Sequence, residues 1–217
     1  MTVRLAVFDC DGTLVDGQGA VCAAMDQAFA AAGLPLPDRH QVRRAVGLSL
    51  PQVVAGLLPD AEAELRREVE QSYRSAYFQA REAGLLTQPL YEGIADLVRA
   101  LDSEGWLLGV ATGKSLRGLQ HVLASHELSR CFVTLQTADF HPSKPHPAML
   151  EAALAEAGAQ PHEAVMIGDT TYDIEMAHSA GVRALGVDWG YHDPHELRAA
   201  GAEAVAASAA ELKDLLQ

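Results

Sequence analysis

The chain has 217 residues, of which 49% are hydrophobic and 21% are charged, and this composition excludes an intrinsically disordered protein. Its 29 acidic and 16 basic residues give a formal net charge of −13, which argues against nucleic acid or an acidic membrane surface as a partner. No apolar run approaches the roughly 18 residues of a membrane helix, no signal peptide is recognisable, and the three cysteines have neither metal nor disulfide spacing. These features predict a cytoplasmic protein without a membrane partner, and they leave its oligomeric state open.

The first predicted elements are one short strand and a series of helices. Residues 3–8 form a β-prone apolar stretch that predicts a strand. Between residues 17 and 85 no strand pattern occurs, and apolar residues recur at helical spacing. The helices expected in this part of the chain are 19–32, 39–46, 51–58 and 61–83.

From residue 86 onward, strand patterns alternate with helical patterns. The expected strands are 106–111, 131–135, 164–167, 182–187 and 204–205, and the expected helices are 94–104, 116–124, 147–157, 172–180, 197–200 and 211–216. Strands that are apolar on both faces and alternate with helices are typical of a parallel sheet covered on both sides. The sequence therefore predicts an α/β fold with a Rossmann-like, three-layer αβα core. Residues 1–16 and 86–217 would form this discontinuous core, and residues 17–85 would form an inserted helical domain.

Four short polar segments each follow a predicted strand, and all four lie at the same edge of the predicted sheet. In open α/β sheets, ligands bind outside the carboxyl ends of the strands. Any one of these segments alone would be read as an ordinary loop or helix cap, but four together predict a functional site. The segments are Asp9-Cys10-Asp11-Gly12-Thr13, Thr112-Gly113-Lys114-Ser115, Ser143-Lys144-Pro145 and Gly168-Asp169-Thr170-Thr171-Tyr172-Asp173.

Carboxylates in these segments would repel one another unless a cation lay among them. Asp9, Asp169 and Asp173 offer hard oxygen ligands, which suit Mg²⁺. A carboxylate beside a metal and a phosphate can attack phosphorus and form an acyl-phosphate. A second carboxylate, such as Asp11 two residues after Asp9, can protonate the leaving oxygen and later deprotonate water.

Donors in the other two segments suit the non-bridging oxygens of a phosphoryl group. Thr112 offers a hydroxyl, Gly113 a backbone N–H and Lys144 a positive charge. The pattern thus predicts phosphoryl chemistry.

The four segments, in this order, resemble the motifs of the haloacid dehalogenase superfamily. The helical block at 17–85 is similar to the small helical cap of that superfamily's phosphoglycolate phosphatases and β-phosphoglucomutases. The resemblance implies Mg²⁺-dependent hydrolysis of a phosphomonoester through an aspartyl-phosphate, with phosphoglycolate as the first candidate substrate.

The resemblance also implies a role for each motif residue. Asp9 would be the nucleophile and a metal ligand, and Asp11 the general acid and base, with its backbone carbonyl on the metal. Thr112, Gly113 and Lys144 would bind the phosphoryl group. The remaining metal ligands would be Asp169 and Asp173.

Some positions depart from the relatives and bear on the reaction. Gly113 stands where many capped relatives have Asn. Val21 and Leu50 stand where β-phosphoglucomutases have His and Arg, which favours a hydrolase over a mutase. The absence of Lys from residues 17–85 argues against phosphonate hydrolysis. The alternatives are a phosphomutase or phosphotransferase, and a non-enzymatic phospho-acceptor module resembling a receiver domain.

Two cations near these motifs have open interpretations. Arg44 is the candidate to bind a substrate carboxylate, and the alternative for it and for Arg43 is a solvated helix face. Lys114 either lies near the site or caps the following helix. Cys10, between two site residues, is expected to point into the core because strand side chains alternate.

Overall fold

The computed structural model describes residues 3–217, and within this range six strands form one parallel sheet. The strands are β1 (Leu5–Phe8), β2 (Leu107–Thr112), β3 (Phe132–Thr137), β4 (Ala164–Gly168), β5 (Arg183–Val187) and β6 (Ala204–Ala206). Their order across the sheet is β3-β2-β1-β4-β5-β6. The order reverses direction beside β1, so the carboxyl end of β1 lies at the topological switch point, where α/β sheets bind ligands.

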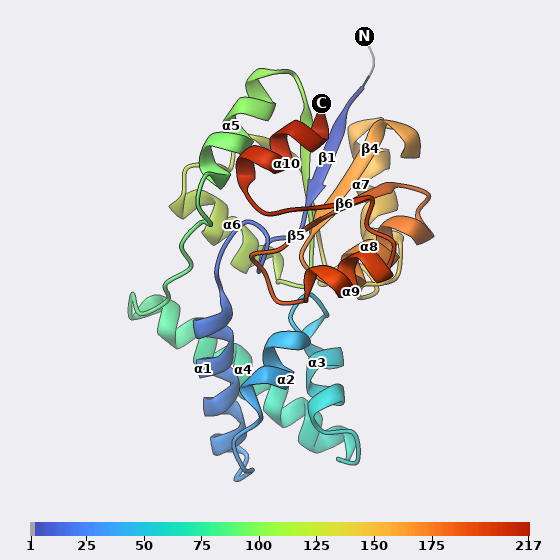
Figure 1. The fold of residues 1–217 in the computed structure, drawn as a ribbon. Coiled ribbons are helices and arrows are strands. Elements are labelled where there is room, and N and C mark those ends of the chain that lie inside the picture. Colours follow the sequence, from blue (N-terminus) through green and yellow to red (C-terminus); the bar gives the residue numbers. More distant parts are fainter. Residues whose placement is uncertain (1–2) are drawn as a thin grey trace.

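Helices cover both faces of the sheet, as the apolar strands predict (Figure 1). They are α5 (Ile94–Ser103), α6 (Leu116–Ser125), α7 (Ala148–Ala157), α8 (Thr171–Ser179), α9 (Pro194–Ala199) and α10 (Ala209–Leu216), with a 3₁₀ turn at Pro161–Glu163. Ala6 and Phe8 of β1 face a cluster built with α5, α6 and α10. Leu5 and Val7 face the opposite cluster, built with α7, α8 and α9. The alternation of strand side chains thus produces the predicted three-layer αβα core.

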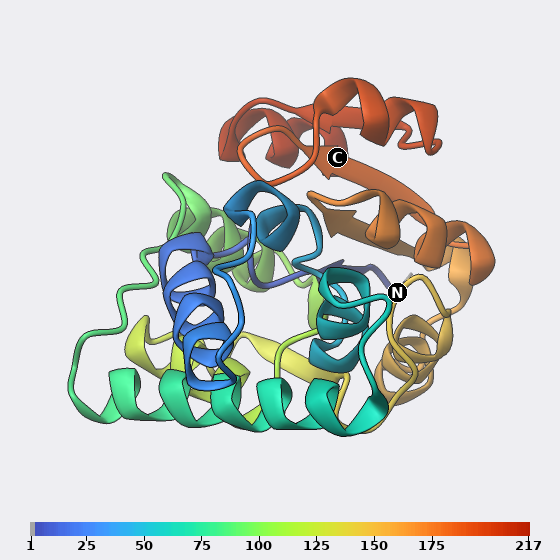
Figure 2. The same cartoon turned by 90° about the horizontal axis from the view of Figure 1, so that it is seen from below.

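Four further helices lie together at the carboxyl end of the sheet, below it in Figure 1. They are α1 (Gln18–Ala31), α2 (Arg39–Arg44), α3 (Leu50–Leu57) and α4 (Ala63–Glu82). Their apolar faces share a hydrophobic cluster of their own, and α4 runs alongside both α1 and α3 (Figure 2). We refer to residues 17–85 as the cap and to the rest as the core, and we propose that the cap is a separate domain with these boundaries.

With one exception, the predicted helices and strands begin and end within two residues of the observed limits, and capping side chains account for two of the differences. The helix predicted at 197–200 begins at Pro194, because Asp193 accepts a hydrogen bond from the His195 N–H and forms a capping box with Glu196. The last helix begins at Ala209 rather than 211, because the Ser208 hydroxyl caps it. In the described part of the chain, no helix has both the length and the apolar composition that crossing a membrane requires.

Candidate active site

The predicted site residues lie at the carboxyl ends of the three central strands. Asp9 directly follows β1, Thr112 is the last residue of β2, and Asp169 directly follows β4. Because β1 pairs in parallel with both β2 and β4, these three positions meet at one edge of the sheet. All three side chains are buried.

Three buried carboxylates converge at this edge. Asp9, Asp169 and Asp173 each offer an oxygen, and these oxygens lie within 4.8 Å of one another. Asp173 reaches the cluster from the first turn of α8, where its Oδ2 accepts hydrogen bonds from the N–H and hydroxyl of Thr170 at 3.1 and 2.7 Å. Gly168 permits this approach, because a Cβ at that position would overlap the Asp173 side chain.

A buried lysine holds two of these carboxylates. The Lys144 Nζ lies 2.9 Å from Asp9 Oδ1 and 2.6 Å from Asp173 Oδ1, and all three side chains are inaccessible to solvent. Burial opposes the charged ammonium, but the carboxylates of Asp173 and Asp9 outweigh it and raise the pKa of Lys144. Lys144 therefore stays protonated and holds the loop after β3 against the end of β1.

One lysine does not neutralise three carboxylates, and the pKa values of the aspartates show the imbalance. Burial, opposed in part by Lys144 and assisted by Asp173, raises the pKa of Asp9 to about 6. Burial and the charges of Asp9 and Asp173 raise the pKa of Asp169 well above its usual range. The site therefore favours a further cation.

The donor set of the cluster fits a hard divalent cation. Asp9 Oδ2 is buried and has no hydrogen-bond partner. The two oxygens of Asp169 are oriented by the Thr13 hydroxyl, which donates at 2.8 Å, and by the Tyr191 N–H, which donates at 2.9 Å. Oriented carboxylate oxygens with one oxygen left unpaired are the ligands that Mg²⁺ prefers, so the cluster could hold such an ion.

We expect stabilisation by Mg²⁺ to grow with pH. The pKa of Asp9 is 3.8 in the ordinary case and about 6 in the folded chain, so the metal-free protein loses stability as pH rises through this window. Mg²⁺ binds the ionised carboxylates, and at about 100 times its Kd it would contribute roughly 2.7 kcal/mol, or about 5–11 °C in Tm. Thermal melts with and without Mg²⁺ should show this shift near about pH 7.5 and a much smaller one near about pH 5.

The matched control for this titration is Asp169→Asn at the same ionic strength. This variant removes one carboxylate of the cluster and should lose most of the Mg²⁺ effect. An equal shift at both pH values would contradict the assignment of the metal to these carboxylates.

Asp11, the predicted general acid and base, is paired with Lys114. The Lys114 Nζ lies 2.7 Å from Asp11 Oδ2 and 2.9 Å from Oδ1. The sequence allowed two interpretations of Lys114, as a residue of the site or as a cap of the following helix. The structure places it in the site, and the cap of α6 is Ser115, whose hydroxyl oxygen accepts from the Gly118 N–H at 3.2 Å.

Gly113 has no side chain because the cap occupies the space. A Cβ at this position would lie 2.7 Å from the carbonyl oxygen of Gly47 and closer still to that of Leu48. The neighbouring Thr112 is buried, and its hydroxyl oxygen accepts from the Lys114 N–H at 3.3 Å. Gly113 therefore leaves room for the backbone of the loop between α2 and α3, which contains Gly47 and Leu48 and which we call the cap loop.

We expect Gly113→Ala to displace the cap loop. Forcing a methyl group against two backbone carbonyls should destabilise the protein by about 1–3 kcal/mol and lower kcat/KM. Gly56→Ala is the matched control: it adds the same methyl group in α3, where nothing lies within 4 Å, and should raise stability by about 0.5–1 kcal/mol. Thermal melts of the two variants measure the contrast, and equal effects would show that the loop yields freely.

Arg44, the predicted contact for a substrate carboxylate, is engaged elsewhere. Its guanidinium donates to both carboxylate oxygens of Glu196 at 2.7 and 2.8 Å, joining α2 of the cap to α9 of the core. His192, whose Nδ1 accepts from the Thr171 N–H, directs its Nε2 proton to the carbonyl oxygen of Arg44 at 2.9 Å. A role of Arg44 in substrate binding therefore stays a prediction.

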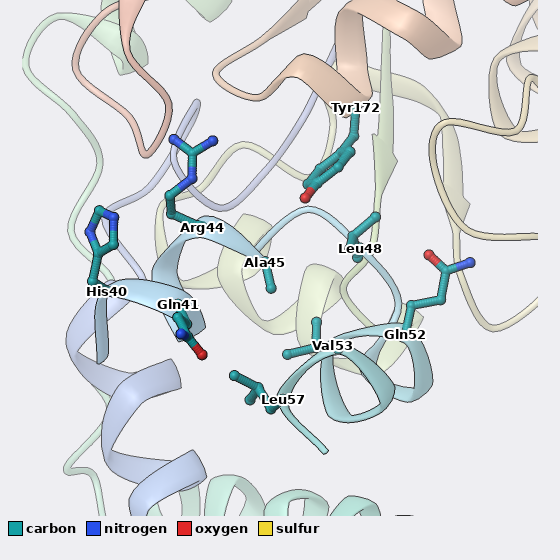
Figure 3. Close-up of a pocket in the computed structure, with 10 residues that line it drawn as sticks. His40, Gln41, Arg44, Ala45, Leu48, Gln52, Val53, Leu57 and Tyr172 are labelled. Carbon is teal, nitrogen blue, oxygen red and sulfur yellow. The ribbon is translucent and has the colours of Figure 1, made fainter. Parts of the chain in front are cut away.

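Arg44 also lines a cavity of about 430 Å³ between α2, α3 and the start of α8 (Figure 3). Leu48 and Gln52 line it from the cap, and Tyr172 lines it from the core. The residues that line this cavity do not include the aspartates at the strand ends. It therefore lies beside the site rather than over it.

Thr13 and Thr170 lie within the predicted segments, but neither they nor Tyr191 were assigned the role of orienting the aspartates. Thr170 carries a signal that could have identified it, because Thr-x-x-Asp is the pattern of a helix-capping box. Tyr191 contributes a backbone N–H, for which no side-chain pattern exists.

Comparison with known proteins identifies the family. Residues 3–181 match the family described as haloacid dehalogenase-like hydrolase. The chain is 34% identical to "Probable phosphatase IndB" of Dickeya dadantii over 90% of the chain and 86% of that protein. It is 30% identical to a phosphoglycolate phosphatase of Vibrio vulnificus over 99% of the chain and 96% of that protein. A haloacid dehalogenase-like family hydrolase from Streptococcus pneumoniae has the same fold, with a TM-score of 0.86, 26% identity, and coverage of 100% of this chain and 99% of its own. The chain thus belongs to the haloacid dehalogenase-like hydrolases and is a phosphatase of that family.

Proposed function

We propose that this phosphatase is an Mg²⁺-dependent phosphomonoester hydrolase that acts on a small phosphorylated metabolite through an aspartyl-phosphate at Asp9. The observation that carries the proposal is the unpartnered, buried Oδ2 of Asp9, within a carboxylate cluster that a single lysine cannot neutralise. A carboxylate that is fixed by Lys144 and still lacks a partner is available for bonding to a metal and to phosphorus.

In the first step, one carboxylate oxygen of Asp9 attacks phosphorus, and the bond from phosphorus to the ester oxygen breaks. Asp11 gives its proton to the departing oxygen. Lys144 and the donors of Thr112 and Gly113 bind the phosphoryl oxygens and stabilise their charge. A Mg²⁺ ion, when held by Asp9, Asp11, Asp169 and Asp173, supplies positive charge that allows an anionic substrate to enter.

In the second step, Asp11 takes a proton from water, and the water oxygen attacks phosphorus. The acyl-phosphate bond breaks, Asp9 is regenerated and inorganic phosphate leaves. Because the backbone of the cap loop lies against Gly113, the cap would exclude bulk water from this intermediate.

We propose phosphoglycolate as the first candidate substrate, since a relative that aligns with almost the whole chain carries that name. Val21 supports hydrolysis over a mutase reaction, because it is buried in the apolar cluster of the cap and cannot exchange protons with a sugar hydroxyl. A cytoplasmic location and the absence of nucleic-acid and membrane partners stay predictions.

The test is phosphate release from a panel of phosphorylated metabolites and p-nitrophenyl phosphate, with Mg²⁺ and with EDTA. We expect Mg²⁺-dependent release from at least one compound, with the best member of the panel identifying the substrate. A folded protein that binds Mg²⁺ and releases phosphate from none of them would contradict hydrolysis and favour a transferase or a phospho-acceptor.

A further inference from the structure

A buried histidine connects the core to the cap and has no part in the mechanism above. His192 lies in the loop after β5 and is only 3% exposed. Its Nδ1 accepts a hydrogen bond from the Thr171 N–H at 3.1 Å, and its Nε2 lies 2.9 Å from the carbonyl oxygen of Arg44. Because a backbone N–H only donates and a carbonyl oxygen only accepts, these partners require a neutral ring with its proton on Nε2.

Both partners of the ring are groups that a helix leaves unpaired at its ends. Thr171 is the first residue of α8, so its N–H has no acceptor within that helix. Arg44 is the last residue of α2, so its carbonyl oxygen has no donor within that helix. Since α8 belongs to the core and α2 to the cap, one imidazole completes a helix end on each side of the boundary between them.

The end of α8 that His192 holds carries a proposed metal ligand. Asp173 is the third residue of this helix and lies in the same turn as Thr171. The backbone next to the ring contacts a second ligand: the His192 N–H donates to the carbonyl oxygen of Asp169 at 3.3 Å, and the Tyr191 N–H donates to its Oδ2 at 2.9 Å. A shift of the first turn of α8 would therefore move Asp173 relative to Asp169.

The other bond of the ring lies where the cap loop begins. Arg44 directly precedes this loop, which then passes close to the active-site segments. The Ser49 N–H donates to the Ser143 hydroxyl oxygen at 2.7 Å, and a Cβ at Gly47 would lie 3.3 Å from the hydroxyl oxygen of Thr170. The bond from the ring thus anchors the start of a loop whose other contacts are with the site.

We propose that His192 is a positioning residue with two separable roles: its Nδ1 holds the first turn of α8, and with it Asp173, while its Nε2 holds the start of the cap loop. The assignment rests on the proposed function, because it takes Asp173 to be a metal ligand. The ring of Tyr172 packs edge-on against the imidazole, with 5.4 Å between the ring centroids, and restricts its orientation. A planar ring held in this way fixes the directions of both hydrogen bonds.

His192→Asn and His192→Gln separate the two roles, because each variant keeps one of the two polar atoms. The amide oxygen of Asn can take the position of Nδ1 and accept from Thr171, but the side chain is too short to reach Arg44. The amide nitrogen of Gln can take the position of Nε2 and donate to Arg44, which leaves the Thr171 N–H without its acceptor. Calorimetric titration measures the Kd for Mg²⁺ without substrate, and hydrogen exchange followed by mass spectrometry measures the protection of residues 45–49.

The two variants should change different readouts. We expect His192→Gln to raise the Kd for Mg²⁺ roughly tenfold, because the turn that carries Asp173 is no longer held, and to leave exchange at 45–49 unchanged. We expect His192→Asn to speed exchange at 45–49 at least roughly threefold, because the cap loop has lost its anchor. The Kd of His192→Asn for Mg²⁺ should stay within about twofold of the wild-type value.

His195→Asn and His195→Gln are the matched controls, because His195 is exposed on α9 and should affect neither readout. Equal effects of the two His192 variants on both readouts would show a general packing role and overturn the assignment, as would no effect of either. If one variant does not fold, the other still decides, because each has one readout that must change and one that must not. A wild-type protein that binds no Mg²⁺ would contradict the proposed function, and exchange at 45–49 would then test the role of Nε2 alone.

Discussion

Asp9→Asn is expected to lower kcat by at least roughly 10⁴-fold, because an amide cannot form the acyl-phosphate on which both steps depend. The side chain keeps its shape, so the loop after β1 and the backbone N–H of Cys10, which donates to Asp9 Oδ1 at 2.6 Å, stay in place. Phosphate release at saturating Mg²⁺ measures the effect.

The stability of this variant separates a chemical effect from a structural one. Ionised Asp9 is disfavoured by burial, which raises its pKa to about 6, and Lys144 keeps its contact with Asp173 when Asp9 becomes neutral. The melting temperature should therefore stay near that of the wild type. Asp60→Asn, in an exposed turn of the cap, is the matched control and should retain activity. Undiminished turnover by Asp9→Asn would exclude the aspartyl-phosphate mechanism.

Lys144→Met is expected to have the largest effect on stability. The variant keeps an unbranched side chain of nearly the same length but leaves Asp9 and Asp173 as buried carboxylates without a counter-charge. Breaking a buried pair in this way typically costs about 3–5 kcal/mol, which corresponds to about 6–20 °C in Tm for a chain of this size. Thermal melts of the metal-free protein measure the loss.

Two comparisons make this result specific. Lys213→Met, which breaks the partly exposed pair with Glu104, should cost less than about 1 kcal/mol. Mg²⁺ should restore part of the stability of Lys144→Met by supplying positive charge to the same carboxylates, but not its activity. A loss no larger than that of Lys213→Met would show that the carboxylates are neutralised in another way.

The fold could be predicted because its strands have an unambiguous pattern. β1 and β4 are buried throughout and alternate with helices, which only a covered parallel sheet accommodates. The helical spacing between residues 17 and 85, with no strand pattern among it, likewise indicated the helices of the cap. Where the limits were wrong, as at Pro194, the decisive contact was a capping side chain, Asp193, outside the apolar pattern.

The site was predictable to the extent that parallel strands bring their carboxyl ends together. That geometry alone places Asp9 and Asp169 side by side. The partner of Lys114 was not predictable, because Asp11 lies 103 positions away and the contact depends on how two loops turn. The need for a glycine at position 113 was not predictable either, because it depends on where the backbone of the cap loop runs, and the residues of the motif do not indicate that path.

The contact between Arg44 and Glu196 has a consequence for how firmly the cap is held. Their side chains are 36% and 39% exposed, so added salt weakens their attraction, since charges in water are screened over about 8 Å at physiological ionic strength. The buried contacts of Lys144 are screened far less. Ionic strength therefore acts on the link between α2 and α9 while leaving the charge balance at Asp9 nearly untouched. The attachment of the cap to the core and the charge balance at Asp9 thus respond to different features of the surrounding solution.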